Sequence, residues 1–259
     1  MRVLMIGDVV GSPGRKALKD NVSGLKREFG LDLVMANGEN AAGGMGITRN
    51  VAEEIFSYGI DFITMGNHVW NKKETAHYIE REERIIRPAN YPAGVPGRGY
   101  KVVPVKKGIN VAIANLSGRV FMDSLDCPFQ VADQLLQEIS SQARIIIFDF
   151  HAEATSEKIA LGWYLNGRVS AVCGTHTHVQ TADEYIMSGG TAYITDIGMT
   201  GAKESIIGFK VDPILERFTT QMPRKFEVAG GLYQLNAVII DFDDDTGEAV
   251  DIQRIQNYQ

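Results

Sequence analysis

Short apolar runs recur along the chain, and each ends in polar or glycine-rich residues. Five of these runs are followed at once by residues that can bind a metal ion or a phosphate, namely residues 3–6, 33–36, 62–65, 145–148 and 169–172. Apolar runs of this length, bounded by turn-forming residues, are typical of strands that are buried on both faces. The pattern therefore predicts five buried strands, each ending beside potential ligands.

Stretches with helical spacing lie between several of these runs. They are residues 15–29, 48–58, 130–139 and 155–164. In the first of them Leu18, Val22 and Leu25 recur near the helical period. The second opens with Thr48, a residue type that caps the N-terminus of helices. Strands that alternate with helices predict a layered α/β domain.

Other strand-like segments follow one another without helices, which predicts antiparallel strands that complete the layers. They are residues 101–105, 109–116, 182–187, 192–194 and 233–242. Residues 117–128 and 198–231 are less regular, and we expect cap-like segments there. No linker divides the chain, so we expect one domain over residues 1–259. Residues 241–247 are typical of a strand and a hairpin turn, because they lack the spacing of an EF-hand calcium loop.

The composition limits the class of protein. The chain has 259 residues, of which 44% are hydrophobic and 22% charged, as in globular proteins with a sizeable core. Its net charge of −6 disfavours stable binding to nucleic acid or an anionic membrane. Cys127 and Cys173 form no CxxC motif, which is typical of reduced thiols. Because residues 3–6 are too short for a signal peptide or membrane span, we expect a cytoplasmic protein.

Polar side chains at the ends of the predicted strands indicate a metal site. His176 and His178 are two of only five histidines, and neutral imidazole is a common ligand of transition metals. The carboxyl ends of strands in an α/β sheet meet at one crevice, so Asp8, Glu39, Asn67 and His151 are expected near this pair. Each motif alone is also compatible with a turn or a structural histidine. Together they predict a metal site that cleaves phosphate esters.

Other catalytic motifs are missing from the glycine-rich segments. Residues 7–16 contain no Gly-Lys-Ser/Thr triplet, and residues 42–46 do not match the dinucleotide-binding fingerprint. The chain also has no Gly-x-Ser-x-Gly motif of serine hydrolases. These glycines are better explained as tight turns that let the backbone approach a metal or phosphate. His77 lies in a helix-like stretch away from every strand end, so we expect it at the surface or half-buried.

The combined motifs resemble those of the calcineurin-like metallophosphoesterase superfamily. The motifs are Gly7-Asp8, Gly38-Glu39-Asn40, Gly66-Asn67-His68, His151 and Gly174-Thr175-His176-Thr177-His178. Residues 37–44, 178–183 and 195–201 look like one branch, the YmdB-like bacterial phosphodiesterases that act on cyclic nucleotides. The likeness extends from Arg2 to about Ile252. It implies a layered α/β fold with mixed β-sheets sandwiched and flanked by helices, and a centre with two metal ions.

The chain departs from the wider superfamily at three points. Most members carry Asp-x-His after the first strand, whereas Asp8 is followed by two valines. Glu39 replaces the usual bridging aspartate, and Asn40 is expected to replace the missing histidine with an oxygen ligand. No acidic residue follows His68, so its orientation must come from elsewhere in the fold. An oxygen-rich site leaves the identity of the metal open.

The resemblance also implies roles for single residues. The first metal would be bound by Asp8, Glu39, Asn40 and His178. The second would be bound by Glu39, Asn67, His151 and His176, with the Glu39 carboxylate between the two metals. The cofactors implied are two divalent or trivalent transition-metal ions, iron or manganese before zinc. His68 is the expected general acid, or else it steadies the phosphoryl oxygens; Arg49, Glu153, Asp196 and Lys203 are weaker candidates for the pocket wall.

The activity implied is a phosphodiesterase that hydrolyses cyclic nucleotides, with 2′,3′-cyclic AMP favoured, by attack of a metal-activated hydroxide on phosphorus. A phosphomonoesterase or nucleotidase with the same centre is an alternative. So are a metal-binding regulatory protein with little turnover and a structural α/β protein. A small phosphoester is the expected partner, without stable nucleic-acid or membrane binding. Apolar side chains in residues 198–231 predict either a cover over the site or a contact between copies of the chain.

Overall fold

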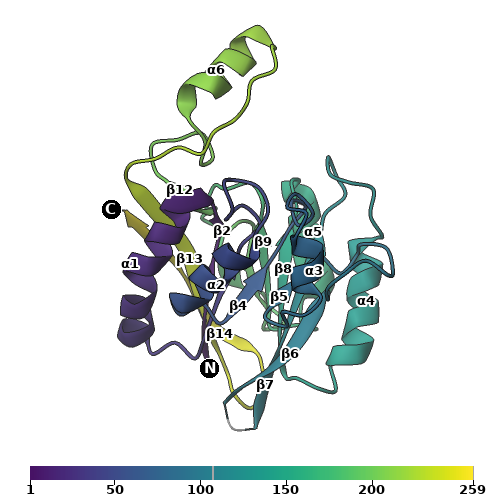
Figure 1. Cartoon of the computed structure of the whole chain (residues 1–259). Helices are drawn as coiled ribbons and strands as arrows, with labels where there is room; N and C mark the ends of the chain where they lie inside the picture. Colours follow the sequence, from purple (N-terminus) through teal and green to yellow (C-terminus); the bar gives the residue numbers. More distant parts are fainter. Residues whose placement is uncertain (107, 259) are drawn as a thin grey trace.

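The protein is built from two facing β-sheets, as seen in a computed structural model that describes residues 1–106 and 108–258 (Figure 1). The first sheet has the order β2 (Asp8–Val9), β12 (Met199–Ala202), β13 (Tyr233–Phe242), β1 (Arg2–Ile6), β3 (Leu33–Asn37), β4 (Phe62–Thr64) and β5 (Ile85–Ile86), with β14 (Ala249–Tyr258) paired to β13. The second has the order β10 (Tyr185–Ile186), β11 (Ala192–Ile194), β9 (Ala171–Thr175), β8 (Ile145–His151), β7 (Ile109–Ser117) and β6 (Tyr100–Lys106).

Both sheets combine a parallel centre with antiparallel strands. In the first, β1, β3, β4 and β5 are parallel, and β13 is antiparallel to β1. In the second, β7, β8, β9 and β11 are parallel, and β6 and β10 are antiparallel edge strands. The carboxyl ends of the parallel strands therefore lie at one edge of each sheet, which is where such sheets bind ligands.

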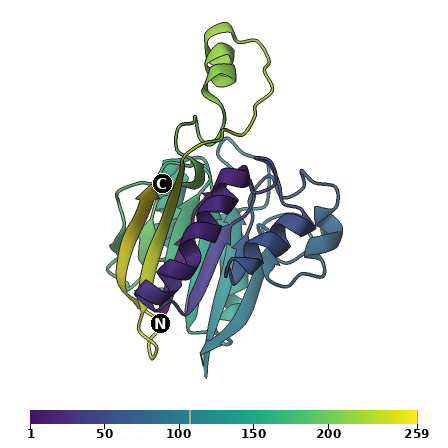
Figure 2. The same cartoon turned by 60° about the vertical axis from the view of Figure 1, so that its left-hand side comes forward.

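Helices cover the outer face of each sheet (Figures 1 and 2). These helices are α1 (Gly11–Phe29), α2 (Arg49–Ser57), α3 (Thr75–Ile79), α4 (Pro128–Ile139) and α5 (Thr155–Leu165), whereas α6 (Val211–Thr220) lies apart from the sheets. Leu18 of α1 and Ile55 of α2 pack in one apolar cluster with Ile6 of the first sheet. Leu136 of α4 and Leu161 of α5 pack in another with alternate side chains of the second sheet.

The central core lies between the two sheets. Met5 and Ile240 of the first sheet share one buried cluster with Ile113, Ile147 and other residues of the second. Each fully buried side chain of this size contributes roughly 1.5–3 kcal/mol relative to exposure. The order is helices, sheet, sheet and helices, so the predicted layered α/β architecture with mixed sheets sandwiched and flanked by helices is confirmed. Both cysteines are free thiols, and no helix in the described residues is long and apolar enough to cross a membrane.

Several predicted boundaries shift in the structure. The first helix begins at Gly11 rather than at residue 15, because Pro13 is accommodated in its first turn. The strand predicted at residues 169–172 is Ala171–Thr175 and runs through Gly174, where a side chain would collide with the carbonyl oxygen of Thr195. The prediction ended the strand before this glycine, which instead permits a close approach of two backbones.

Other elements differ more from the prediction. The strand predicted at residues 182–187 is only Tyr185–Ile186, and β14 was not predicted. The segment 198–231, predicted to be irregular, contains β12 and α6. Residues 118–127 form no helix or strand, as predicted. Thr48 does cap α2, since its Oγ1 accepts a hydrogen bond from the Val51 amide at 3.3 Å, and His77 is exposed on α3.

Helix α6 projects from the layered body (Figures 1 and 2). Of its residues only Ile214 is buried, whereas Leu215 and Phe218 are exposed. A helix with one buried side chain gains little from packing, so its place depends on the two chain segments that connect it to the body. That connection contributes to the site described next.

Candidate metal centre

The predicted ligands converge at the carboxyl ends of the parallel strands. They come from separate strand ends, as expected from their positions in the sequence. Asp8 begins β2, Glu39 and Asn40 follow β3, Asn67 and His68 follow β4, His151 ends β8, and His176 and His178 follow β9. Of these residues, Asp8, Glu39, Asn40, His151 and His178 are buried, and the others are half-buried. The sequence thus predicted that residues from five separate segments come together in one cluster.

Glu39 lies at the centre of the cluster. Its Oε2 is 3.1 Å from His151 Nε2 and accepts a hydrogen bond from the His68 amide at 3.2 Å. Its Oε1 accepts a hydrogen bond from Asn40 Nδ2 at 3.1 Å and lies 3.2 Å from His68 Nδ1. Gly66 makes room for this carboxylate, because a side chain there would collide with both Glu39 and His151. The two oxygens of Glu39 therefore face different partners.

The orientation of His151 is fixed by Thr175 and Asp149. The Thr175 hydroxyl donates to Asp149 Oδ1 at 2.7 Å, so its oxygen accepts the proton of His151 Nδ1 at 2.9 Å. His151 Nε2 then faces Asn67 Oδ1 at 3.1 Å and His176 Nδ1 at 3.0 Å. A metal-binding histidine commonly donates its second nitrogen to such a partner. Sequence reasoning missed this role, although Asp149 is a charged residue within an apolar strand.

Asp149 is itself held in place by a buried polar network. Its Oδ2 accepts hydrogen bonds from Asn37 Nδ2 at 3.2 Å and from the Thr64 hydroxyl. Burial raises the pKa of Asp149 above its ordinary value, while His151 and these donors act in the opposite direction. The network joins β3, β4, β8 and β9 behind the cluster, so the position of His151 depends on both sheets.

The His176-Thr177-His178 loop has an unusual backbone. The φ angles of His176 and His178 are 99° and 67°, in a region where non-glycine residues cost about 1–3 kcal/mol each. Asp196 holds the loop, since its Oδ2 accepts hydrogen bonds from the Thr177 amide at 3.0 Å and the Thr177 hydroxyl at 2.7 Å. Lys158 Nζ lies 2.6 Å from the same oxygen, and both side chains of this ion pair are buried. Asp196 was predicted as a wall residue, but it anchors the loop.

The two histidines of this loop face different partners. His176 turns Nδ1 toward His151, and its Nε2 lies 3.0 Å from Glu153 Oε2. His178 donates from Nδ1 to the carbonyl oxygen of Ile207 at 2.9 Å and places Nε2 3.1 Å from Asn40 Nδ2. Each ring has one nitrogen occupied by a protein partner outside the cluster. The other nitrogen of each ring points into it.

His68 is oriented by Glu39 and Asn40, which follow the neighbouring strand β3. Its Nδ1 lies 2.9 Å from Asn40 Oδ1 and 3.2 Å from Glu39 Oε1, and its amide is also bound by Glu39. The orientation of His68, which was expected to come from elsewhere in the fold, is therefore provided by Glu39 and Asn40. This contact was not predicted, because it joins the loops that follow two different strands.

The electrostatics of the cluster favour a cation. Burial opposes protonation of His151, but the charge and hydrogen bond of Glu39 raise its pKa to about 9. Burial and the neighbouring His151 lower the pKa of His176 to about 3. Asp8 Oδ1 is buried without a hydrogen-bond partner in the described part of the chain, and burial raises the pKa of Asp8 to about 6. The cluster thus attracts one positive charge and leaves the acceptor atom Asp8 Oδ1 unsatisfied.

The donor atoms also fit a metal ion. One ligand atom from each of Glu39, His151 and His176 lies within 4.8 Å of the others. Among residues 1–106 and 108–258, no other trio of histidine, cysteine or acidic side chains has its ligand atoms this close. Imidazole nitrogens mixed with carboxylate and amide oxygens suit iron, manganese or zinc better than calcium or magnesium.

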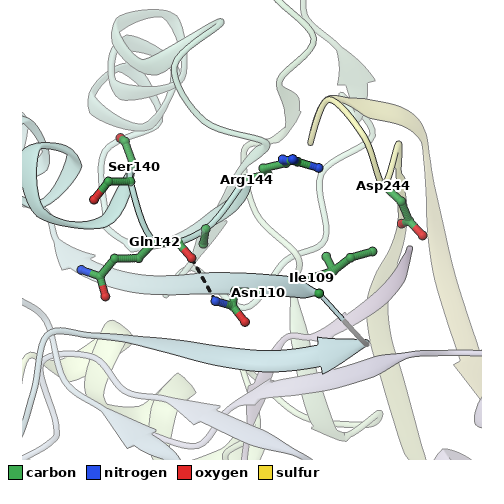
Figure 3. A pocket seen from close by; sticks show the side chains of 9 residues that line it. Ile109, Asn110, Ser140, Gln142, Arg144 and Asp244 are labelled. Carbon is green, nitrogen blue, oxygen red and sulfur yellow. Dashed lines mark hydrogen bonds between the residues drawn. The ribbon is translucent and has the colours of Figure 1, made fainter.

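A pocket of about 290 Å³ opens onto the cluster. It is lined by Glu39, Asn40, Met45, His68, Glu153, His176, Thr177, His178, Ile207, Phe209 and Phe226. Of the weaker candidates, only Glu153 reaches it, while Arg49 forms an exposed ion pair with Glu53. A separate cavity of about 310 Å³ lies beside Ile109, Arg144 and Asp244 (Figure 3). Because Ile109 begins β7 and Ser117 at its other end pairs with His151, this cavity is remote from the cluster.

Comparison with known proteins gives consistent matches over nearly the whole chain. Residues 4–255 match the YmdB-like protein family. The chain is 51% identical to a 2′,3′-cyclic-nucleotide 2′-phosphodiesterase of Bacillus subtilis, over 98% of this chain and 96% of that protein. It is 34% identical to a putative phosphatase/phosphodiesterase of Mycoplasma genitalium, over 99% and 92%.

Two solved structures are similar throughout. A hypothetical protein from Thermus thermophilus has a TM-score of 0.95 at 43% identity, with all of both chains covered. A phosphatase from Mycoplasma pneumoniae has a TM-score of 0.95 at 33% identity, with 100% of this chain and 93% of that one covered.

Proposed function

Because the chain belongs to the YmdB-like family, we propose that it is a dinuclear metal-dependent phosphodiesterase that hydrolyses 2′,3′-cyclic nucleotides. The resemblance inferred from the motifs is thereby confirmed. The relative from Bacillus subtilis, named for this reaction, supports the substrate class. The observation that carries the proposal is the convergence of acceptor atoms on Glu39 in a pocket at the strand ends.

We assign two sets of ligands that share Glu39. Asp8, Glu39, Asn40 and His178 would hold the first metal. Glu39, Asn67, His151 and His176 would hold the second. Support comes from the carboxylate of Glu39, whose Oε1 faces Asn40 and whose Oε2 faces His151. His178 Nε2 lies on the Asn40 side and His176 Nδ1 on the His151 side, so the two rings serve different sets.

Asn40 links metal binding to the orientation of His68. Its amide nitrogen faces Glu39 and His178, and its oxygen faces His68 Nδ1. As a metal ligand, Asn40 would present the oxygen toward Glu39 and His178 instead. This would require the amide of Asn40 to rotate, which would move its oxygen away from His68. His68 would then be held through Glu39 alone.

The oxygen-rich first set favours iron or manganese. Structural and catalytic zinc sites usually have three or four protein ligands in a tetrahedral arrangement, so zinc ranks lower. When bound, the metal ions would supply positive charge beside the phosphate and a water molecule of lowered pKa as nucleophile.

The residues of the chain hold the reacting groups in place. His68 lines the pocket and is bound through Nδ1, so Nε2 is the nitrogen available to the substrate. In its protonated form it can donate a proton to the ribose oxygen as the phosphorus–oxygen bond breaks. Glu153 orients His176 through Nε2.

A phosphomonoesterase that uses the same centre is the second candidate, because the relative from Mycoplasma genitalium is named a putative phosphatase/phosphodiesterase. The two activities share the cluster and differ in the pocket wall. A cyclic diester reaches the cluster with its ribose and base attached on one side, so the wall described in the next subsection bears on the choice.

An assay of the manganese-loaded enzyme separates these candidates. The substrates are 2′,3′-cyclic AMP and the monoester 3′-AMP at equal concentration. We expect consumption of the cyclic diester with accumulation of a nucleoside monophosphate. Release of inorganic phosphate from 3′-AMP at a higher kcat/KM than cleavage of the diester would contradict the proposal. The Glu39→Gln variant is the control, since both activities should be lost with the shared ligand.

A further inference from the structure

Helix α6 and the two chain segments that connect it to the body form an arm. The base of this arm is a short β-ribbon that forms one wall of the pocket. We call residues 206–209 and 226–229 the ribbon. Ile206 and Phe209 exchange backbone hydrogen bonds at 2.9 and 3.0 Å around a tight turn. The Lys210 amide donates to the Glu227 carbonyl and the Ala229 amide to the Gly208 carbonyl, each at 2.9 Å. These bonds join the two chain segments that lead to and from α6.

The ribbon is hydrogen-bonded directly to the cluster of predicted ligands. Ile207, in the tight turn, accepts the hydrogen bond of His178 Nδ1 at 2.9 Å. Its φ angle is 47°, which is a rare conformation for a β-branched residue. Strain of this kind persists where the surrounding structure enforces it, commonly at functional sites. The ribbon is thus positioned by the same histidine that faces the proposed first metal.

Two aromatic rings of the ribbon face the pocket. Phe209 is buried against Gly44, where a side chain would be too close to its ring. Phe226 is half-buried, and its ring centre lies 5.9 Å from that of Phe209. Arg217 of α6 lies 5.2 Å from the centre of the Phe226 ring but does not line the pocket. Arg217 thus contacts Phe226 from outside the set of residues that line the pocket.

The pocket has two chemically different parts. Its charged and imidazole side chains, such as Glu39, His68 and His178, all belong to the cluster or contact it. Its apolar side chains are Met45, Ile207, Phe209 and Phe226, from the glycine-rich loop and the ribbon. A cyclic nucleotide has the matching division, with an anionic phosphate at one end and a flat aromatic base at the other.

We propose that the ribbon is the nucleobase subsite of this enzyme, in which the base packs against Phe226 and Phe209, the two aromatic rings that line the pocket. The inference rests on the proposed phosphodiesterase function. Thr177 is the one uncharged hydroxyl side chain that lines the pocket, so the apolar wall has few groups that could read the hydrogen-bonding edge of a base. Stacking accepts every base, because each has an aromatic face.

The subsite therefore predicts how the enzyme ranks its substrates. Hydrolysis of the four 2′,3′-cyclic nucleotides should differ by about tenfold or less in kcat/KM, with the larger purines ahead of the pyrimidines. A cyclic phosphate without a base should still reach the metal cluster but bind less tightly. Its KM should exceed that of 2′,3′-cyclic AMP by roughly fivefold or more, the range measured for loss of one stacked base.

The test compares two substrates and three variants of the manganese-loaded enzyme. The substrates are 2′,3′-cyclic AMP and glycerol 1,2-cyclic phosphate, which has the same five-membered diester ring but no base. The variants are Phe226→Ala, Phe226→Trp and Phe218→Ala. Phe218 is the matched control, because it is a phenylalanine of the same arm that is 70% exposed and does not line the pocket.

We expect Phe226→Ala to lower the ratio of kcat/KM for 2′,3′-cyclic AMP over that for glycerol 1,2-cyclic phosphate by roughly fivefold or more, mainly through KM. Phe226→Trp should keep the ratio, and Phe218→Ala should match the wild type. If Phe226→Ala leaves this ratio unchanged, even with an equal loss of kcat/KM on both substrates, the proposed subsite is wrong. Failure of the wild type on both cyclic phosphates would instead reject the phosphodiesterase function, and the subsite with it.

Discussion

Thr175 accepts the Nδ1 proton of His151 at 2.9 Å and donates its own hydroxyl proton to Asp149 at 2.7 Å. This relationship decides which nitrogen of His151 faces the cluster. With Nδ1 bonded to Thr175, Nε2 is the nitrogen that faces Glu39, Asn67 and His176. The acceptor oxygens of Glu39 and Asn67 each lie 3.1 Å from Nε2, so a proton or a metal ion is required between them and this nitrogen.

Replacing Thr175 by valine should weaken the second metal set. The variant Thr175→Val keeps the shape of the side chain but removes the acceptor, so that His151 can adopt the other tautomer. Loss of such an outer partner commonly lowers metal affinity by about 10- to 100-fold. Titration with Mn²⁺ followed by calorimetry measures the change. Thr175→Ser, which keeps the hydroxyl, should bind nearly as the wild type, and equal weakening in both variants would argue against the tautomer role.

His176 and His178 should affect different metals. His178→Ala removes the nitrogen ligand of the proposed first set, and His176→Ala removes one from the second. Each variant should retain about one metal ion per chain, and the double variant should retain neither at normal affinity. Electron paramagnetic resonance of the Mn²⁺-loaded proteins distinguishes single ions from coupled pairs. Coupled-pair spectra in either single variant would contradict the division.

Asp196 should be needed for both stability and the histidine loop. Asp196→Asn leaves Lys158 buried without its ionic partner, and breaking such a pair costs about 3–5 kcal/mol. We expect a lower Tm by calorimetry together with loss of metal binding. The double variant Asp196→Asn with Lys158→Met should regain much of the stability, because the unpaired charge is gone. Recovery of full metal binding in that double variant would show that Asp196 does not hold the loop.

Metal uptake should release protons. In the metal-free protein the pKa of His151 is about 9, so at pH 7 its Nε2 carries a proton that a metal must displace. The proton is lost as the pH rises through 9, so the apparent metal affinity should rise with pH and level off above that value. Calorimetry of Mn²⁺ binding at pH 7 in two buffers with different ionisation heats measures the release. Identical heats in both buffers would contradict this protonation state.

The sequence was most informative where function depends on strand ends. Apolar runs followed by Asp8, Glu39, Asn67, His151 and the histidine pair predicted both the buried strands and their convergence. Such ligands are visible because each stands directly after a buried run. Asp149 and Thr175 were missed, because the sequence around a polar residue within a strand does not indicate which distant residue its side chain contacts.

The arm was the least predictable part of the fold. Helix α6 has apolar residues at helical spacing, namely Val211, Ile214, Leu215 and Phe218, but only Ile214 is buried, so this pattern did not indicate how the helix is placed. The conformation of Ile207 and its contact with His178 depend on long-range packing that β-branched residues do not indicate locally. The segment that holds Phe209 and Phe226 was expected to be irregular, with apolar side chains that either cover the site or contact another copy of the chain. Their place in the pocket wall required the folded chain.

The central claim is that two metal ions share Glu39. The most direct test is elemental analysis of the protein purified without chelators, with Glu39→Gln purified alongside it. The account predicts close to two transition-metal ions per wild-type chain, mainly iron or manganese, and a loss of both in the variant. Fewer than about one ion per wild-type chain, or two ions retained after Glu39→Gln, would contradict it.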